Sequence, residues 1–344
     1  MPPRLNAWWK REGPALCVMA PRQKPVEDIR EPVPPANSAE KWTNPEYRLQ
    51  RAEYEMSRTY FGGEAFPYFD SHIGPGNLAT FIGSEPEFAE DTVWFKPCII
   101  APEAHPALCF DPSNRYFRDQ MAIISKGVSQ AAGRYLVGVP DLIENIDILV
   151  SLRGMENLLS DMIDRPEWVE SMVAEINKVW FEVFDIIREK VADPWGGNTW
   201  SGFRIWSPGR TAKLQCDASA AFSPAMFHRF VVPALIEQCQ RLDRSLYHLD
   251  GTQCICHLDA LLSIPELTAI EWTPQAGRPG GGNPVWYDLY RRILRAGKCV
   301  QAIDVLPSEV IPLIDAVGPK GLFIMTRTES EEEARRLESR IHSY

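Results

Sequence analysis

The chain has 344 residues with 45% hydrophobic and 24% charged residues, 8 cysteines and a formal net charge of −10, which is typical of a globular protein able to bury a large core without disulfides. The acidic balance, without a basic stripe interleaved with aromatic residues, argues against nucleic-acid binding. Because no apolar run approaches the roughly 20 residues of a membrane span and no signal-peptide pattern opens the chain, we expect a cytoplasmic protein with reduced thiols.

The first 90 residues are predicted to be an irregular and helical extension. Residues 21–45 carry six prolines, which disfavour helix, and residues 45–60 then show helical spacing with Pro45 in the first turn. The Gly/Pro-rich aromatic stretch 60–81 is long enough for a lid or wall, or for the subunit interface of a homodimer.

Strand-like and helix-like segments alternate from about residue 92 onward. Helical spacing covers residues 117–132, 153–163, 166–190, 224–243, 256–263, 285–296, 307–316 and 329–342. The strand candidates are 92–95, 134–139, 199–206, 212–217, 245–250, 267–272, 298–303 and 321–326. This alternation predicts a (β/α)₈ TIM barrel over residues 91–344, with residues 1–90 packed on it in one structural domain. A doubly wound open sheet is the alternative.

In such barrels, active sites lie at the carboxyl ends of the strands, and four predicted strands end in an aspartate. Asp141 and Asp304 precede helical patterns and are interpreted as helix caps. Asp217 lacks such a pattern, because the next cap is Ser223, and Asp250 is followed by Gly251, which suggests a tight turn or a close ligand.

The stretch 247–261, "YHLDGTQCICHLDAL", concentrates residues of the ligand type. His248 and Asp250 are two apart in a predicted strand and therefore share a face, as an acid/base pair or as two ligands of an open metal site. Cys254 and Cys256 are too close in sequence for a zinc knuckle. Residues from 256 onward are interpreted as the start of the next helix.

Three segments, 209–235, 247–277 and 297–330, resemble the uroporphyrinogen decarboxylase superfamily, and the likeness runs from about Tyr135 to the end of the chain. This group of (β/α)₈ barrels includes decarboxylases, cobalamin-dependent methyltransferases that use zinc to activate a thiol, and cobalamin-independent methionine synthase. The decarboxylases resemble one another in a "PxWxMRQAGRY" segment, and "APRQKP" at 20–25 departs from it. The zinc methyltransferases have a His-x-Cys pair and a later Cys. The corresponding positions here are His248-x-Asp250 and Met325 or Thr326.

The resemblance implies methyl transfer on a small substrate, with zinc as the metal and a corrinoid supplied by a separate carrier protein. His248, Asp250 and Asp217 are the expected catalytic residues, and His248, Asp250 and Cys216 the candidate metal ligands, with Glu271 as another residue able to complete the shell. The expected substrate contacts are Trp272 as an apolar wall, Tyr247, Gln275, Arg327 and Arg204. One alternative is metal-free decarboxylation, with Asp217 or Asp250 stabilising a protonated intermediate and Arg204 or Arg210 holding carboxylates. A non-catalytic ligand-binding barrel is another.

Overall fold

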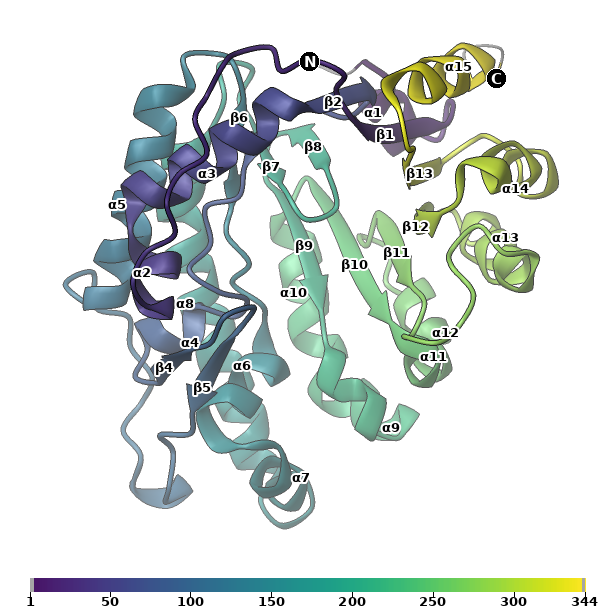
Figure 1. The fold of residues 1–344 in the computed structure, drawn as a ribbon. Helices are drawn as coiled ribbons and strands as arrows, with labels where there is room; N and C mark the ends of the chain where they lie inside the picture. The colour runs from purple at the N-terminus through teal and green to yellow at the C-terminus, as the bar shows by residue number, and fades with distance from the viewer. Residues whose placement is uncertain (1–2, 342–343) are drawn as a thin grey trace.

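The structure is a computed structural model that describes residues 3–341 and 344, and Figure 1 shows its elements. The strands are β1 (Ala15–Pro21), β2 (Thr59–Gly63), β3 (Tyr68–Phe69), β4 (Glu85–Phe88), β5 (Val93–Lys96), β6 (Leu136–Val139), β7 (Gly197–Trp200), β8 (Ile205–Pro208), β9 (Thr211–Gln215), β10 (Arg244–Asp250), β11 (Ala269–Thr273), β12 (Cys299–Val305) and β13 (Leu322–Arg327). The helices are α1 (Pro3–Trp9), α2 (Ser38–Thr43), α3 (Pro45–Arg58), α4 (Leu78–Phe81), α5 (Arg115–Ala131), α6 (Asn145–Arg153), α7 (Met155–Asp164), α8 (Pro166–Val191), α9 (Pro224–Phe230), α10 (Val232–Arg241), α11 (Gly251–Cys254), α12 (Leu258–Leu262), α13 (Tyr287–Arg295), α14 (Val310–Val317) and α15 (Glu331–Ile341).

A mostly parallel sheet forms the centre of the molecule. Its strand order is β2-β1-β13-β12-β11-β10-β9, and every neighbouring pair is parallel except β1 with β2. The order follows the chain from β9 to β13, with helices between the strands, as crossover connections require. The predicted α/β class with a parallel sheet is confirmed.

A second sheet, β3-β6-β7-β8, lies beside the first. Asn198 on β7 joins the two, because its side-chain amide donates to the carbonyl of Thr211 on β9 at 2.7 Å and its side-chain oxygen accepts from the Thr211 backbone N–H at 3.1 Å. Within the described part of the chain, the hydrogen-bonded ladders form separate sheets and not one continuous ring.

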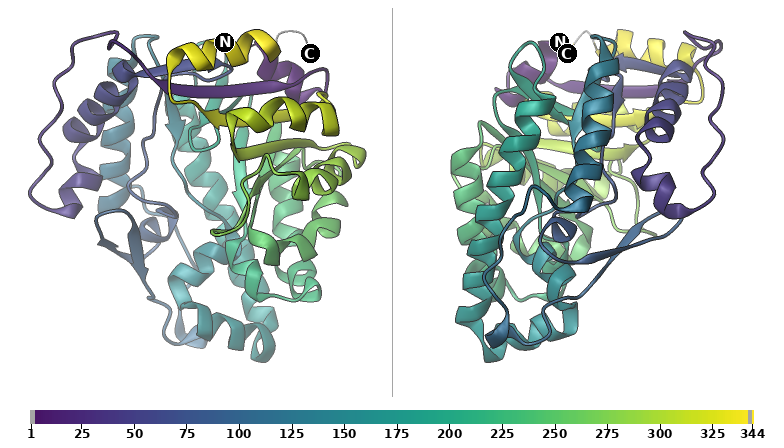
Figure 2. Two further views of the ribbon diagram at one scale, coloured as in Figure 1. Left: turned by 45° about the vertical axis from the view of Figure 1, so that its right-hand side comes forward. Right: turned by 90° about the vertical axis from the view of Figure 1, so that its left-hand side faces the viewer.

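The two faces of the central sheet bury different sets of residues. One face carries Leu246, Ala269 and Phe323 in an apolar cluster with Trp8 and Trp9 of α1. The indole of Trp8 donates to the Gly321 carbonyl at 2.9 Å, so α1 closes the amino-terminal ends of these strands. The opposite face packs against the helices and forms the larger core. α15 lies on β1 and β2, so that the last helix covers the first strands (Figure 2).

Several local predictions hold, and three strand assignments change. The helix predicted from residue 45 is α3, with Asn44 as its N-cap, and Ser223 caps α9. Residues 15–21, which the sequence left in the extension, form β1 inside the central sheet. The segment 92–95 lies in an antiparallel β4–β5 hairpin, and 199–206 is two antiparallel strands, because residues 201–204 form a turn. The domain boundary at residue 90 stays a prediction.

Among the residues that the structure describes, no helix combines the length and the apolar character needed to cross a bilayer.

Candidate functional site

Three polar side chains converge at the carboxyl ends of β9 and β10. His248 and Asp250 are two residues apart on β10, and Asp217 follows β9 at the start of a 3₁₀ helix, Asp217–Ala221. One ligand atom from each residue lies within 4.8 Å of those of the other two. The structure therefore brings together the three residues predicted to be catalytic.

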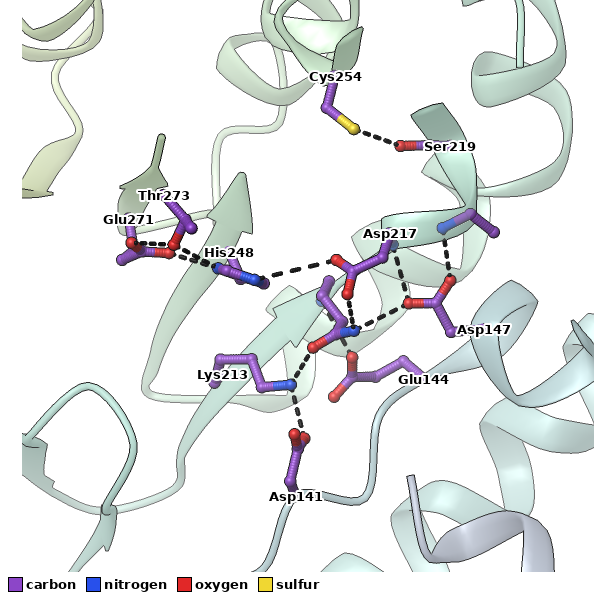
Figure 3. Close-up of polar contacts among 12 residues, drawn as sticks. Asp141, Glu144, Asp147, Lys213, Asp217, Ser219, His248, Cys254, Glu271 and Thr273 are labelled. Atoms are coloured by element: carbon purple, nitrogen blue, oxygen red, sulfur yellow. Dashed lines mark hydrogen bonds and ion pairs between the residues drawn. The ribbon is translucent and has the colours of Figure 1, made fainter. Parts of the chain in front are cut away.

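His248 is oriented by a buried carboxylate. Its Nδ1 lies 2.5 Å from Oε2 of Glu271, which stands opposite it in the β10–β11 register and is fully buried. Thr273 donates from its hydroxyl to the other Glu271 oxygen at 2.8 Å. Because an Nδ1–H donates to Glu271, Nε2 is left free to face Asp217, whose Oδ1 is 4.0 Å away (Figure 3).

Burial alone would lower the pKa of His248, but the Glu271 carboxylate opposes this effect and leaves the pKa raised. The pKa of Asp217 is raised to about 6, because its carboxyl is partly withdrawn from water and lies near the Asp147 carboxylate, while His248 opposes the shift. The site thus holds a carboxyl group and an imidazole whose pKa values are both raised, as is common at functional sites.

The half-buried side-chain amide of Gln215 links Asp217 to a cation. Nε2 of Gln215 donates to Oδ2 of Asp217 and to Oδ2 of Asp147, both at 3.0 Å, and its Oε1 accepts from the Lys213 ammonium. Lys213 in turn contacts Asp141 at 2.6 Å. Since an ammonium only donates and carboxylates only accept, these partners fix which end of the Gln215 amide is the oxygen and which is the nitrogen. Gln215 therefore fixes Oδ2 of Asp217 and leaves Oδ1 directed at His248.

Asp147 holds the backbone of Asp217 in place by hydrogen bonds. Its carboxylate accepts the backbone N–H groups of Asp217 at 2.9 Å and of Ala218 at 3.0 Å. These are the first amides of the 3₁₀ helix, which would otherwise lack partners. Asp147 comes from α6, so this contact also joins the helix layer to the carboxyl end of β9.

Glu144 adds a buried acid to the same cluster. Its carboxylate accepts the backbone N–H of Gln215 at 3.0 Å. Burial raises the pKa of Glu144 to about 8, although the nearby Lys213 ammonium opposes the shift. A carboxyl group with this pKa is mostly protonated at neutral pH, and the ion pair of Lys213 is with Asp141 at 2.6 Å.

We expect the Glu144→Gln variant to lose part of the pH dependence of stability. The folded pKa of about 8 exceeds the ordinary value of 4.5, so the stability contributed by this proton is complete below about pH 4.5 and lost as pH rises through about 8. The expected slope in between is on the order of 1 kcal/mol per pH unit. Urea unfolding of both proteins between about pH 5 and about pH 8 measures it. Parallel curves for the two proteins would contradict the assignment.

Tyr247, Trp272 and Cys216 are not brought to this site. Tyr247 and Trp272 neighbour His248 and Glu271 along their strands and so point to the opposite face of the sheet. Cys216 directly follows β9, and all three side chains belong to the core beneath the helices. Trp272 packs against Trp286 at a centroid distance of 4.9 Å. Burial raises the pKa of the Cys216 thiol well above its ordinary value, which disfavours the thiolate that a metal ligand needs.

The aromatic wall beside His248 comes from Phe203, in the turn between β7 and β8. Its ring lies 5.0 Å from the imidazole, centroid to centroid. The amide of Gln301 on β12 donates to the Phe203 carbonyl at 2.6 Å and holds the turn in place. The sequence alone does not identify Phe203, because residues 199–206 show the pattern of one continuous strand.

Of the remaining predicted substrate contacts, Gln275 lies beside the site, whereas Arg327 and Arg204 lie elsewhere. Gln275 accepts from Thr252 at 3.0 Å and lines, with Asp217 and Asp250, a cavity of about 480 Å³. Arg327 lines another cavity at the end of β13. Arg204 is buried with its guanidinium over the Tyr68 ring, 3.8 Å from the ring centroid.

No protein-family model matches the sequence, and no curated protein matches it. The fold does match a solved structure, a methyltransferase from Methanosarcina mazei, with a TM-score of 0.65. The similarity covers 99% of this chain and 98% of that chain at 11% sequence identity. A match at this identity shows a shared fold over the whole length, and the chemistry has to be argued from the site.

Proposed function

We propose that the protein is a methyltransferase acting on a small substrate at the carboxyl ends of the parallel strands. We also propose that the two sheets together correspond to a (β/α)₈ barrel of the uroporphyrinogen decarboxylase superfamily. The observation that carries the proposal is the group of Asp217, His248 and Asp250, with Glu271 behind the imidazole. The whole-length fold match to a methyltransferase supports it.

The donor set fits one divalent metal, and zinc is the ion we propose. Zinc bonds of about 2 Å to nitrogen and oxygen are compatible with three ligand atoms lying within 4.8 Å of one another. Nε2 of His248 and one oxygen each from Asp217 and Asp250 would hold the ion. Glu271 resembles the carboxylate that accepts the second N–H of metal-bound histidines. When bound, zinc would lower the pKa of a thiol or hydroxyl acceptor and so generate the nucleophile.

The chain's own residues would prepare the acceptor for transfer. Glu271 fixes the tautomer and the orientation of His248, and Gln215 fixes the Asp217 carboxylate. The Phe203 ring shields one side of the imidazole from water, which strengthens electrostatic interactions at the site. We propose a corrinoid on a separate carrier protein as the methyl donor.

Metal analysis of the purified protein tests this proposal. We expect about one zinc per chain in the wild type, because three protein ligands plus one open position make a catalytic zinc site. The Asp250→Asn variant is expected to hold zinc at least about tenfold more weakly, since it removes an anionic ligand. Asp91→Asn, a change at an exposed aspartate elsewhere, is the control. A wild-type protein that takes up no zinc and yet decarboxylates its substrate would favour the metal-free alternative.

A further inference from the structure

A cavity of about 720 Å³ lies between α3 and the carboxyl ends of β1 and β13. Its size is in the range of small-molecule sites. None of its lining residues belongs to the group of Asp217, His248 and Asp250. We name it the Arg327 cavity, after the residue that β13 contributes to its wall.

Two cations of its wall are already neutralised by carboxylates. Arg51 contacts Glu55 at 2.6 Å and Glu31 at 2.8 Å. Lys41 contacts Glu90 at 2.6 Å. These side chains therefore shape the cavity without leaving an uncompensated charge in it.

A third cation, Arg48, forms hydrogen bonds with backbone carbonyl groups. Its guanidinium donates to the carbonyls of Asp70 and His72 at 2.8 and 2.9 Å. Burial lowers the pKa of Arg48, although the Asp70 carboxylate opposes the shift. Arg48 is therefore tied to the loop that follows β3.

Arg327 differs from these three. Its side chain is exposed, and no carboxylate oxygen of the described residues lies within 4.0 Å of its guanidinium nitrogens. In a protein of net charge −10, an uncompensated guanidinium inside a cavity is a ready anchor for an anion. Arg204, which has no ion pair with a described carboxylate, lies over the Tyr68 ring. Burial raises the pKa of Tyr68, and Arg204 and Arg327 oppose this shift.

The wall also carries the polar side chains of Glu55, Thr59, Asp70 and His72, and another part of it is apolar and aromatic. Met19, Met56, Phe61 and the ring of Tyr68 line the cavity. These surfaces suit a planar hydrocarbon body, whereas a phosphate would need several more donors than one guanidinium fork supplies.

The Arg327 cavity and the His248 site share one loop. Phe203 packs against the His248 imidazole, and the next residue, Arg204, holds Tyr68 in the cavity wall. A molecule anchored in the cavity therefore lies behind the same turn that borders the imidazole.

We propose that the Arg327 cavity binds a small aromatic carboxylate, with the Arg327 guanidinium as its anchor. The inference goes beyond the proposed function, because it concerns a separate cavity whose binding is measurable without turnover. The bidentate contact between guanidinium and carboxylate supplies the affinity, and the aromatic wall supplies the selectivity for the ring.

Isothermal titration of the metal-free full chain with phenylacetate, its neutral isostere phenylacetamide and inorganic phosphate tests the proposal. Phenylacetate is expected to bind at least about tenfold more tightly than the other two, since a hydrogen bond to a charged group contributes about 1.5–3 kcal/mol. In Arg327→Gln the preference for the acid over the amide is expected to vanish. Arg295→Gln, which changes an exposed arginine outside the cavity, is expected to bind like the wild type.

Equal affinity for acid and amide, tighter binding of phosphate, or unchanged binding by Arg327→Gln would each overturn the inference. The His248→Ala variant separates it from the proposed function. That variant is expected to keep phenylacetate binding, because His248 does not line the cavity. Phenylacetate binding by a protein that holds no zinc would leave the inference standing while the proposed function fails.

Discussion

The His248→Ala variant is expected to lose methyl transfer by at least about 10³-fold while remaining folded. The change removes the single nitrogen donor of the proposed metal site, and the two remaining carboxylates cannot replace an imidazole held by Glu271. The expected structural cost is about 1–3 kcal/mol, because Glu271 loses its partner but keeps the hydrogen bond from Thr273. Turnover with a methylated corrinoid protein, zinc content and urea unfolding are the three measurements.

Two further variants test whether the loss of methyl transfer in His248→Ala is specific to the proposed site. Glu271→Gln keeps an acceptor for the Nδ1–H of His248 but removes the charge, so a loss of about 10- to 100-fold in zinc affinity is expected. His228→Ala changes an exposed histidine on α9 and is expected to leave activity and zinc content unchanged. Full activity in His248→Ala would rule out the assignment of this residue.

Spacing within a strand was enough to predict the first half of this site. His248 and Asp250 are two positions apart in a β-like run, and a strand places such residues on one face. The same alternation places Tyr247 on the other face, although it was grouped with the substrate contacts. The period of two in "YHLD" contained that distinction, and applying it to each neighbour would have separated Tyr247 from His248.

The position of Glu271 opposite His248 cannot be predicted from the pattern of a single strand. It stands opposite His248 only because β10 and β11 pair in a particular register, and register depends on packing across the whole sheet. The sequence suggested Glu271 only as a ligand able to complete the shell, and the structure places it behind the imidazole. Trp272 neighbours Glu271 on β11 and therefore points to the other face of the sheet, into the core and away from the site.

The fold was predictable where elements alternate and less so where the chain departs from the pattern. β1 is a short apolar run at residues 15–21, which period alone does not distinguish from a buried helix. The β7–β8 turn was hidden inside a run of aromatic and β-branched residues. Asp141 was interpreted as a helix cap, but it pairs with Lys213, a contact between residues 72 positions apart that local patterns do not contain.

The Lys213→Met variant is expected to lose about 3 kcal/mol of stability. Lys213 is buried, contacts Asp141 at 2.6 Å and donates to Gln215, so its removal leaves a carboxylate and an amide oxygen without their donor. Breaking a buried pair costs about 3–5 kcal/mol, and we expect the lower end because the Asp141 side chain remains 21% exposed. Urea unfolding at neutral pH measures the loss, and adding Asp141→Asn is expected to restore part of it.

Lys126 supplies a matched control, because it forms an ion pair of the same length with Glu46, 2.6 Å, at the surface. Lys126→Met is expected to cost less than about 1 kcal/mol, since water screens exposed pairs. Burial, and not the length of the contact, is therefore the variable that separates the two lysines. Equal losses in the two variants would contradict a structural role for Lys213. A larger loss of stability in Lys213→Met than in Lys126→Met would support the structural role of Lys213. A reduced zinc affinity in the same variant would show that Lys213 also supports the site through Gln215 and Asp217.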